Sequence, residues 1–158
     1  MVLPQEGAAN GFDGIALAAK SVETTLPDSR IDRTSFTPGM KASTIKETRD
    51  EIAKLTASLH KPVDFSFTPR QPFEPAPYQR GWRMLSRALA WRITEAGAIG
   101  DYESVVSDVI LAHKFGFALT GGSVVDATHG LATVDEARQA VAAFLTSMGS
   151  AQLARLSK

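Results

Sequence analysis

The 158-residue chain contains no cysteine, which excludes both a disulfide framework and a thiolate site. It also lacks an excess of either charge, because 17 basic and 17 acidic residues leave a formal net charge of zero. Proteins that bind nucleic acid across their surface carry a clustered excess of Lys and Arg, so we expect no nucleic-acid partner. No apolar run approaches the roughly 18 residues that a membrane-spanning helix needs. These absences predict a soluble protein without a membrane span.

Catalytic motifs are scarce as well. The sequence holds no Gly-x-Ser-x-Gly elbow, no phosphate-binding loop and no dinucleotide-binding glycine pattern. The three histidines fall on different predicted elements, and only His129 has an acid, Asp126, three residues away on a shared helix face. An acid-x-x-His pair is typical of metal sites in helical bundles, but such sites take further ligands from other helices. We therefore predict no catalytic residue, no cofactor and no metal, with Asp126 and His129 as the one candidate ligand pair.

The composition itself is that of a globular domain, with 44% hydrophobic and 22% charged residues. A chain of this length buries roughly 70% of its unfolded surface and needs no metal or disulfide to hold its core. We expect one helical domain over residues 1–158. It divides into N-terminal helices (1–60), a proline-rich strap (61–79) and a C-terminal helical hairpin region (80–158).

Both ends of the chain read as cuts in a longer gene product. Gly149 and Ser150 are typical of a helix end followed by a new N-cap, and the helix that begins at Ala151 is too short to complete its packing. Met1 directly before Val2 is also compatible with a start codon placed on a mature sequence. The compartment therefore stays open: cytoplasmic as the sequence stands, exported if Met1 replaces a removed signal peptide.

Apolar residues at helical spacing predict an all-α fold, a bundle of four to six helices arranged as antiparallel hairpins. The expected helices cover residues 12–25, 44–59, 80–97 and 102–119, followed by a stretch of about 25 residues that starts near Ser123. Asn10 is the expected cap of the first helix, and Thr44 to Glu47 form a capping box for the second. Turn-forming residues predict an ordered surface loop over 26–42, which we favour over a lid.

The last predicted helix carries an apolar seam with alternating spacings of three and four, which favours one continuous helix. The seam consists of Val124, Ala127, Leu131, Val134, Val141, Leu145 and Met148, with Arg138 at the one seam position that is not apolar. Gly130 leaves an alternative, in which the helix kinks and a second capping box at Thr133 to Glu136 starts a new one.

Between the second and third helices, Lys61 to Tyr78 contain five prolines and four aromatic residues, so this segment is expected to be extended. Pro69, Pro72 and Pro75 align on one edge of a polyproline II helix, as in ligands of SH3-type domains. We favour the simpler interpretation, a strap whose aromatic side chains pack against its own domain.

The third predicted helix is basic, with Arg80, Arg83, Arg87 and Arg92, whereas the acids gather in the region that follows. One interpretation is a groove in which Arg83 and Arg87 bind an anion. The other, which we favour, is pairing with the next helix, because a short turn makes consecutive helices antiparallel neighbours.

The run Gly97-Ala98-Ile99-Gly100-Asp101-Tyr102-Glu103, with the small residue Ala112 after it, resembles the turn and second helix of a tetratricopeptide-type repeat over about residues 97–116. The resemblance implies a helical hairpin and a role in binding peptides or proteins within a concave groove. No second copy follows at the expected period, so only the hairpin geometry is carried over.

We expect a non-catalytic interaction or scaffold domain that binds a protein partner or itself, with Trp82, Arg83, Arg87 and Trp91 as the interaction residues. One alternative is a small-molecule or metal-binding protein, or a hydrolase, with a site near the third helix that uses Arg83, Arg87, Asp126 or His129. Another is the subunit of an oligomer, assembled through the wide apolar face around Trp82, Met84 and Trp91.

Overall fold

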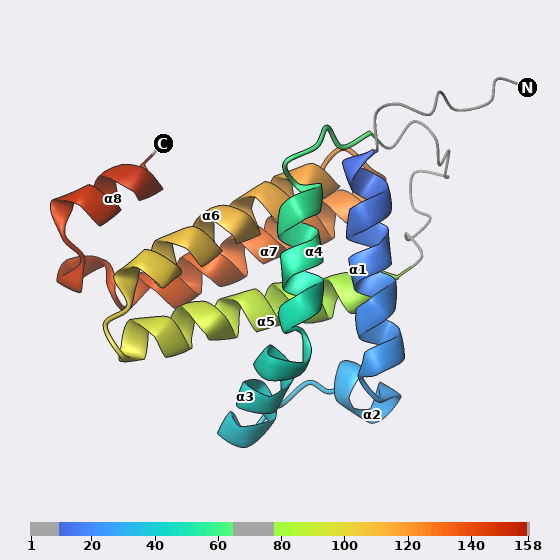
Figure 1. The fold of residues 1–158 in the computed structure, drawn as a ribbon, viewed down its shortest axis with the longest axis horizontal. Coiled ribbons are helices and arrows are strands. Elements are labelled where there is room, and N and C mark those ends of the chain that lie inside the picture. The colour runs from blue at the N-terminus through green and yellow to red at the C-terminus, as the bar shows by residue number, and fades with distance from the viewer. Residues whose placement is uncertain (1–9, 65–77, 158) are drawn as a thin grey trace, which may run out of the picture.

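The computed structural model describes residues 10–64 and 78–157. Over these residues the chain folds into helices without a strand, which confirms the predicted all-α class. Figure 1 shows two layers: α1 and α4 lie side by side and run across a bundle of three long helices, α5, α6 and α7. None of the helices in the described ranges is long and apolar enough to span a membrane. In chain order the elements are α1 (Gly11–Thr25), α2 (Asp28–Ile31), α3 (Pro38–Glu47), α4 (Arg49–Ser58), α5 (Gln79–Ala98), α6 (Tyr102–Leu119), α7 (Val124–Ala142), η1 (Leu145–Ser147) and α8 (Ser150–Leu156).

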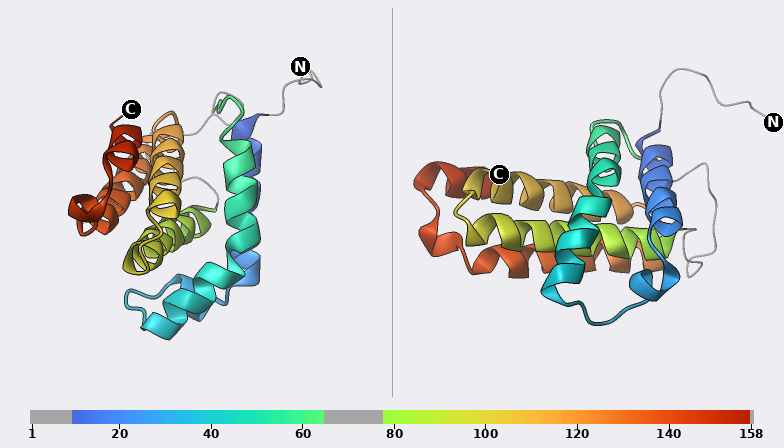
Figure 2. Two further views of the ribbon diagram at one scale, coloured as in Figure 1. Left: turned by 60° about the vertical axis from the view of Figure 1, so that its left-hand side comes forward. Right: turned by 60° about the horizontal axis from the view of Figure 1, so that its bottom comes forward.

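The first layer is fixed where α1 begins. The side-chain oxygen of Asn10 accepts hydrogen bonds of 3.0 Å from the backbone N–H groups of Phe12 and Asp64. This confirms the predicted cap and joins the segment after α4 to the start of α1. α1 then crosses α5 at Gly81, where a Cβ atom would lie 2.2 Å from the carbonyl oxygen of Ala19. A glycine is therefore required for the two layers to approach this closely, and Figure 2 shows α1 and α4 standing together against the bundle.

Apolar side chains of both layers meet in one core. Trp82 is fully buried and packs edge-to-face on Phe12, with ring centroids 6.3 Å apart. Met84 is fully buried as well, so these two residues of the predicted apolar face belong to the core, whereas its third residue, Trp91, is partly buried. The other large side chains without exposed surface are Ile15, Ile31, Leu55, Leu85, Leu89, Ile93, Phe115 and Leu119.

α6 and α7 approach each other backbone to backbone at a glycine pair. A Cβ atom on Gly130 would lie 2.2 Å from the carbonyl oxygen of Gly116, and a Cβ atom on Gly116 would lie 2.5 Å from that of Gly130. The buried residues of α7 are accordingly small or polar, apart from one valine: Asp126, Gly130, Thr133, Ala137 and Val141. Much of the apolar seam predicted for this helix therefore points outward, with Val124 52% and Leu131 58% exposed.

The capping box predicted at Thr44 to Glu47 is wrong. The helix begins earlier, at Pro38, because the Thr37 hydroxyl oxygen accepts a hydrogen bond of 3.3 Å from the backbone N–H of Met40. Thr44 lies inside α3 and donates its hydroxyl proton to the carbonyl oxygen of Met40 at 2.8 Å. The chain breaks after Glu47, so the predicted second helix is divided between α3 and α4. The predicted surface loop over 26–42 likewise contains α2 and the start of α3.

The C-terminal part also differs from the prediction. α7 ends at Ala142 after 19 residues, and η1 and α8 follow it. The predicted alternative of a new helix at Thr133 is wrong, because this residue lies within α7 and its hydroxyl donates to the carbonyl oxygen of His129 at 2.9 Å. The predicted strap falls mostly on residues 65–77, which lie outside the described part of the chain.

Three of the four arginines on α5 lie within ion-pair distance of an acid, Arg83 at the limit, 3.9 Å from Asp32. Arg80 contacts Asp28 at 2.7 Å and Asp32 at 2.9 Å, which ties the region of α2 to the start of α5. Arg92 contacts Asp108 on α6 at 2.9 Å. The pair of Arg92 with Asp108 is the contact between consecutive antiparallel helices that the segregation of charge predicted.

Candidate functional site

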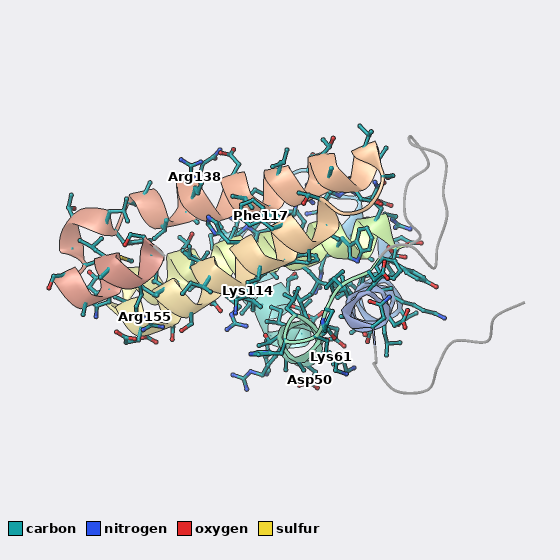
Figure 3. The ribbon with its side chains drawn as sticks, turned by 90° about the horizontal axis from the view of Figure 1, so that it is seen from above. Asp50, Lys61, Lys114, Phe117, Arg138 and Arg155 are labelled. Atoms are coloured by element: carbon teal, nitrogen blue, oxygen red, sulfur yellow. The ribbon has the colours of Figure 1, made fainter. Side chains whose placement is uncertain are left out.

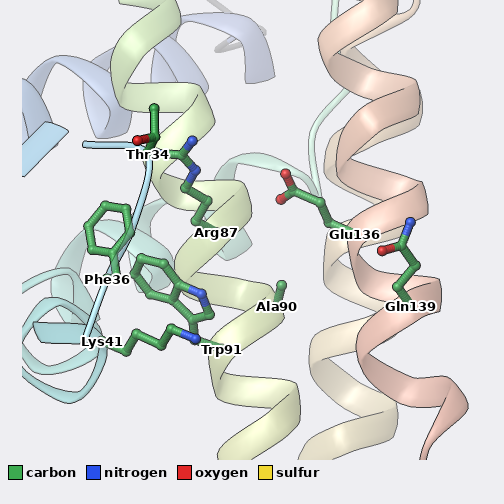
Figure 4. Close-up of a pocket in the computed structure, with 8 residues that line it drawn as sticks. All are labelled: Thr34, Phe36, Lys41, Arg87, Ala90, Trp91, Glu136 and Gln139. Atoms are coloured by element: carbon green, nitrogen blue, oxygen red, sulfur yellow. The ribbon is translucent and has the colours of Figure 1, made fainter. Parts of the chain in front are cut away.

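Arg87 and Trp91, two of the four predicted interaction residues, line a pocket between α5, α7 and the segment that leads into α3 (Figure 4). Its volume of about 290 Å³ lies at the lower limit for small-molecule sites. Arg83 lies one turn before Arg87 on α5, whereas Trp82 points into the core and has no exposed surface. The pocket is lined by Thr34, Phe36, Lys41, Arg87, Ala90, Trp91, Glu136 and Gln139.

An aromatic pair forms one wall of the pocket. The rings of Phe36 and Trp91 have centroids 4.8 Å apart and planes inclined at 55°. A cation lies over each ring: Lys41 Nζ is 5.9 Å from the Trp91 ring, and Arg87 Cζ is 5.5 Å from the Phe36 ring. Such contacts hold the charged groups at the edge of the pocket while their stems pack on the rings.

Two guanidinium groups make the α5 side of the pocket positive. Arg87 donates to the backbone carbonyl oxygen of Arg33 at 3.0 Å, and Arg83 lies 3.9 Å from Asp32, at the limit of an ion pair. Burial lowers the pKa of Arg87, and the charge of Arg83 lowers it further, against the opposing effect of Glu136. Within the described ranges, Nε of Arg83 is buried without a hydrogen-bond partner. The protein therefore neutralises this pair of cations only in part.

Glu136 brings a negative charge to the pocket from α7 (Figure 4). Its Oε2 atom is buried and has no hydrogen-bond partner among the described residues. Burial raises the pKa of Glu136, and attraction to Arg87 offsets this only in part. The two groups act on each other electrostatically, yet no ion pair between them is formed. The pocket therefore contains a carboxylate and a guanidinium that both lack a full complement of partners.

The structure assigns Asp126 a role in helix capping. Its carboxylate accepts a hydrogen bond of 2.9 Å from the backbone N–H of Ser123, whose hydroxyl oxygen accepts one from the backbone N–H of Asp126. His129 is half-buried, and burial together with the charge of Arg83 lowers its pKa, against the attraction of Asp126. In the described part of the chain, no three His, Asp or Glu side chains gather where they could hold a metal ion.

A second candidate surface lies on the outer sides of α6 and α7, and we call it the α6–α7 face. Its apolar residues are Phe117 on α6, which is 57% exposed, and Val124 and Leu131 on α7. The contact of Gly116 with Gly130 brings their two helices together along this face. Figure 3 looks onto it and shows Phe117 together with the basic residues Lys114 and Arg138.

Of the residues that the sequence singles out, Arg87 and Trp91 line the pocket, whereas Phe36, Glu136 and the α6–α7 face were not predicted as functional. Phe36 comes from a segment predicted as a surface loop, and Glu136 carried only a capping signal that α7 does not use. The sequence did contain a signal that could have identified Leu131 as exposed. Beside the apolar seam of its helix lie small residues such as Gly130 and Ala137, and small residues allow the closest contact between helices.

Comparison of the chain with models of known protein families, with curated proteins and with solved structures finds no match. The helical hairpin that the tetratricopeptide resemblance implies is present as α5 and α6, which pack against each other. No family model supports membership of that family. The chain is a helical protein whose functional surfaces have to be argued from its own geometry.

Proposed function

We propose that this chain is a non-catalytic interaction domain that binds a partner protein on the α6–α7 face. The observation that carries the proposal is the exposure of two residues of the apolar seam of α7, Val124 and Leu131, each of which is more than half exposed. A helix packed against a domain normally turns its apolar stripe to the core. Here the glycine contact turns small residues inward instead, and Phe117 extends the exposed apolar surface onto α6. Clustered exposed apolar side chains are typical of interaction surfaces.

The charge around the α6–α7 face favours an acidic partner. Lys114 and Arg138 lie on the same face as Phe117 (Figure 3), and both are exposed. Asp135, which lies between Leu131 and Arg138 at helical spacing, is exposed on the same side of α7, so the face carries two basic residues beside one acidic residue. A second copy of the chain related by a two-fold axis would bring the basic residues of both copies together, which is unfavourable. We therefore favour a different protein over self-association, and a partner surface that carries Asp or Glu beside its apolar residues.

The packing of α8 on α6 favours a helix as the element that binds. α8 already packs on α6, where Arg155 and Gln152 both contact the carboxylate of Glu103. α6 thus accommodates a short amphipathic helix near its start, while Phe117 near its end has no such cover among the described residues. An acidic amphipathic helix laid along α6 and α7 would bury Phe117 and Leu131 and pair with Lys114 and Arg138.

The proposal can be tested by replacing Leu131 with a photo-crosslinkable phenylalanine analogue and irradiating the chain in extracts of its own cells. A cross-linked protein is then purified and its affinity for the unmodified chain is measured by calorimetry. We expect Leu131→Glu to weaken this complex at least about 100-fold, as loss of a central apolar contact does. Phe117→Ala should weaken it as well.

Leu17 on α1 provides the matched control, because it is 60% exposed and lies away from the α6–α7 face. Leu17→Glu should leave the affinity unchanged. If Leu131→Glu and Leu17→Glu bind the purified partner equally well, the α6–α7 face is not the interaction surface. If size measurements show instead that the chain forms a dimer that Leu131→Glu dissociates, the face mediates self-association and the proposed acidic partner is wrong.

A further inference from the structure

We infer that the pocket between α5 and α7 binds a small zwitterion, a molecule with an ammonium group and a carboxylate a few bonds apart, as in a free amino acid. This site is separate from the α6–α7 face and goes beyond the proposed interaction function. The two charges of such a ligand correspond to two charged groups that the protein leaves incompletely paired, Arg87 on α5 and Glu136 on α7.

The positive side of the pocket is suited to a carboxylate. Arg87 uses one N–H group on the carbonyl oxygen of Arg33 and places its guanidinium carbon over the Phe36 ring. Arg83 adds a second positive charge one turn away, and Lys41 a third at the rim. Guanidinium groups present several N–H donors in a plane and bind carboxylates with two hydrogen bonds.

The negative side is suited to an ammonium group. Glu136 is the acid that lines the pocket, and its buried Oε2 atom accepts no hydrogen bond within the described ranges. The half-buried carboxylate of Glu136 lacks a hydrogen-bond donor at Oε2 among the described residues, so a group that brings N–H donors and a positive charge is favoured beside it. Gln139, from the next turn of α7, lines the same side and offers an amide that can donate or accept.

The space and the wall between the two charges limit the size of the ligand. A volume of about 290 Å³ lies at the lower limit for small-molecule sites, so the pocket suits a small ligand. The rings of Trp91 and Phe36 form an apolar wall beside the charged groups. An amino acid with an apolar side chain meets all three requirements, because it has a carboxylate for the arginines, an ammonium group for Glu136 and an apolar part for the aromatic wall.

Three compounds with one carbon skeleton test the inference: phenylalanine, phenethylamine, which lacks the carboxylate, and 3-phenylpropanoate, which lacks the amine. Their binding to the full chain is measured by calorimetry at neutral pH, with Trp91 fluorescence as a second readout. We expect phenylalanine to bind at least about tenfold more tightly than either single-charge compound. Glu136→Gln should remove most of that advantage and leave the affinity for 3-phenylpropanoate unchanged or higher, because the ammonium contact is lost and a negative charge near the carboxylate site is removed.

Glu95→Gln is the matched control, since Glu95 is an exposed carboxylate on α5 that does not line the pocket. It should bind all three compounds like the original chain. The inference is overturned if none of the compounds binds, if phenylalanine binds no better than both single-charge compounds, or if Glu136→Gln weakens phenylalanine and 3-phenylpropanoate alike. Thermal unfolding of each variant verifies that the comparison is made between folded proteins.

Discussion

Gly116 on α6 and Gly130 on α7 face each other so closely that a methyl group on Gly130 would lie 2.2 Å from the carbonyl oxygen of Gly116. Neither backbone can move away without separating two helices that share the core of the bundle. This one contact sets the distance between α6 and α7 and the rotation of α7 about its axis. It thereby determines which side chains of α7 are left outside.

Gly130→Ala is expected to lower the free energy of unfolding by about 3 kcal/mol or more, because the new methyl group meets backbone and the helices have to separate. Gly39→Ala is the matched control: Gly39 also lies in a helix, and a Cβ atom there has nothing within 4 Å. That control should gain roughly 0.5 kcal/mol from helix propensity. Urea unfolding of both variants measures these changes in the free energy of unfolding. If the two substitutions change it equally, the contact between the two glycines is not tight.

Substitution of two phenylalanines on α6 distinguishes a residue of the core from a residue of the α6–α7 face. Phe115 is fully buried, whereas Phe117 is 57% exposed. We expect Phe115→Ala to destabilise the protein by about 3–5 kcal/mol and Phe117→Ala to change its stability by about 0.5 kcal/mol or less. Denaturant unfolding measures both. A large loss for Phe117→Ala would mean that this ring serves the fold, and the proposed interaction surface would lose its main aromatic residue.

The ion pair of Arg92 with Asp108 gives a prediction with a dependence on pH. Asp108 is buried while the Arg92 side chain keeps 31% exposure, so we expect Arg92→Leu to cost about 2 kcal/mol at pH 7, less than the about 3–5 kcal/mol of fully buried pairs. Burial already raises the pKa of Asp108 in spite of Arg92. Without its partner the carboxyl group will protonate even more readily in the folded state.

The penalty of Arg92→Leu should therefore shrink as the pH falls below the pKa of Asp108, because the protonated carboxyl no longer carries a buried charge. Unfolding curves at several pH values between about 4 and 7 provide the measurement. Adding Asp108→Leu should restore most of the stability at pH 7. A double variant as unstable as the single one would show that the loss comes from packing and not from the unpaired carboxylate.

Glu136→Gln should stabilise the chain at neutral pH by an amount on the order of 1 kcal/mol, because it removes a charge that is largely buried and unpaired. The direction in which this stabilisation changes with pH follows from the raised pKa of Glu136. A folded-state pKa above the unfolded value of about 4.3 means that the folded protein loses stability as the pH rises through this range. The advantage of the glutamine variant should thus disappear toward pH 4. An advantage that does not vary with pH would exclude the buried charge as its cause.

The contribution of His129 to stability should change with pH in the opposite direction to that of Glu136. Burial and Arg83 lower its pKa, so the folded protein binds a proton on His129 less readily than the unfolded chain, whose value is about 6.5. The stability that the neutral form of His129 contributes is fully present above pH 6.5. It is lost as the pH falls through the lower pKa that His129 has in the folded state. His129→Gln should flatten this part of the stability curve. An NMR titration of the imidazole that gives a pKa at or above 6.5 would contradict the prediction.

The sequence predicts those parts of the fold that local chemistry decides. The predicted cap Asn10 fixes where α1 begins, α6 has the predicted bounds, and an apolar stripe marks α5. The rotation of α7 was not predictable in this way, because its buried face consists of residues such as Gly130 and Ala137, which give little hydrophobic signal. The pattern of larger apolar residues is conspicuous in the sequence, yet much of it is outside.

The pocket illustrates the same limit. Arg83, Arg87 and Trp91 were predicted as functional because they share one helix and a distinctive composition. Their counterparts Phe36 and Glu136 come from segments far apart in the chain, and only the packing of α3 and α7 on α5 brings them together. The incomplete pairing of Arg87 and Glu136 depends on how these segments pack together, and no local sequence pattern predicts it.

The backbone contact between α6 and α7 also bears on how association would be driven. A helix that packs through glycine, alanine and threonine removes little hydrocarbon from water when the domain folds. The apolar surface of Val124, Phe117 and Leu131 therefore stays in contact with solvent in the folded chain, and its burial remains available as a driving force for association. Association along this face should accordingly show a negative change in heat capacity, the signature of apolar surface leaving water.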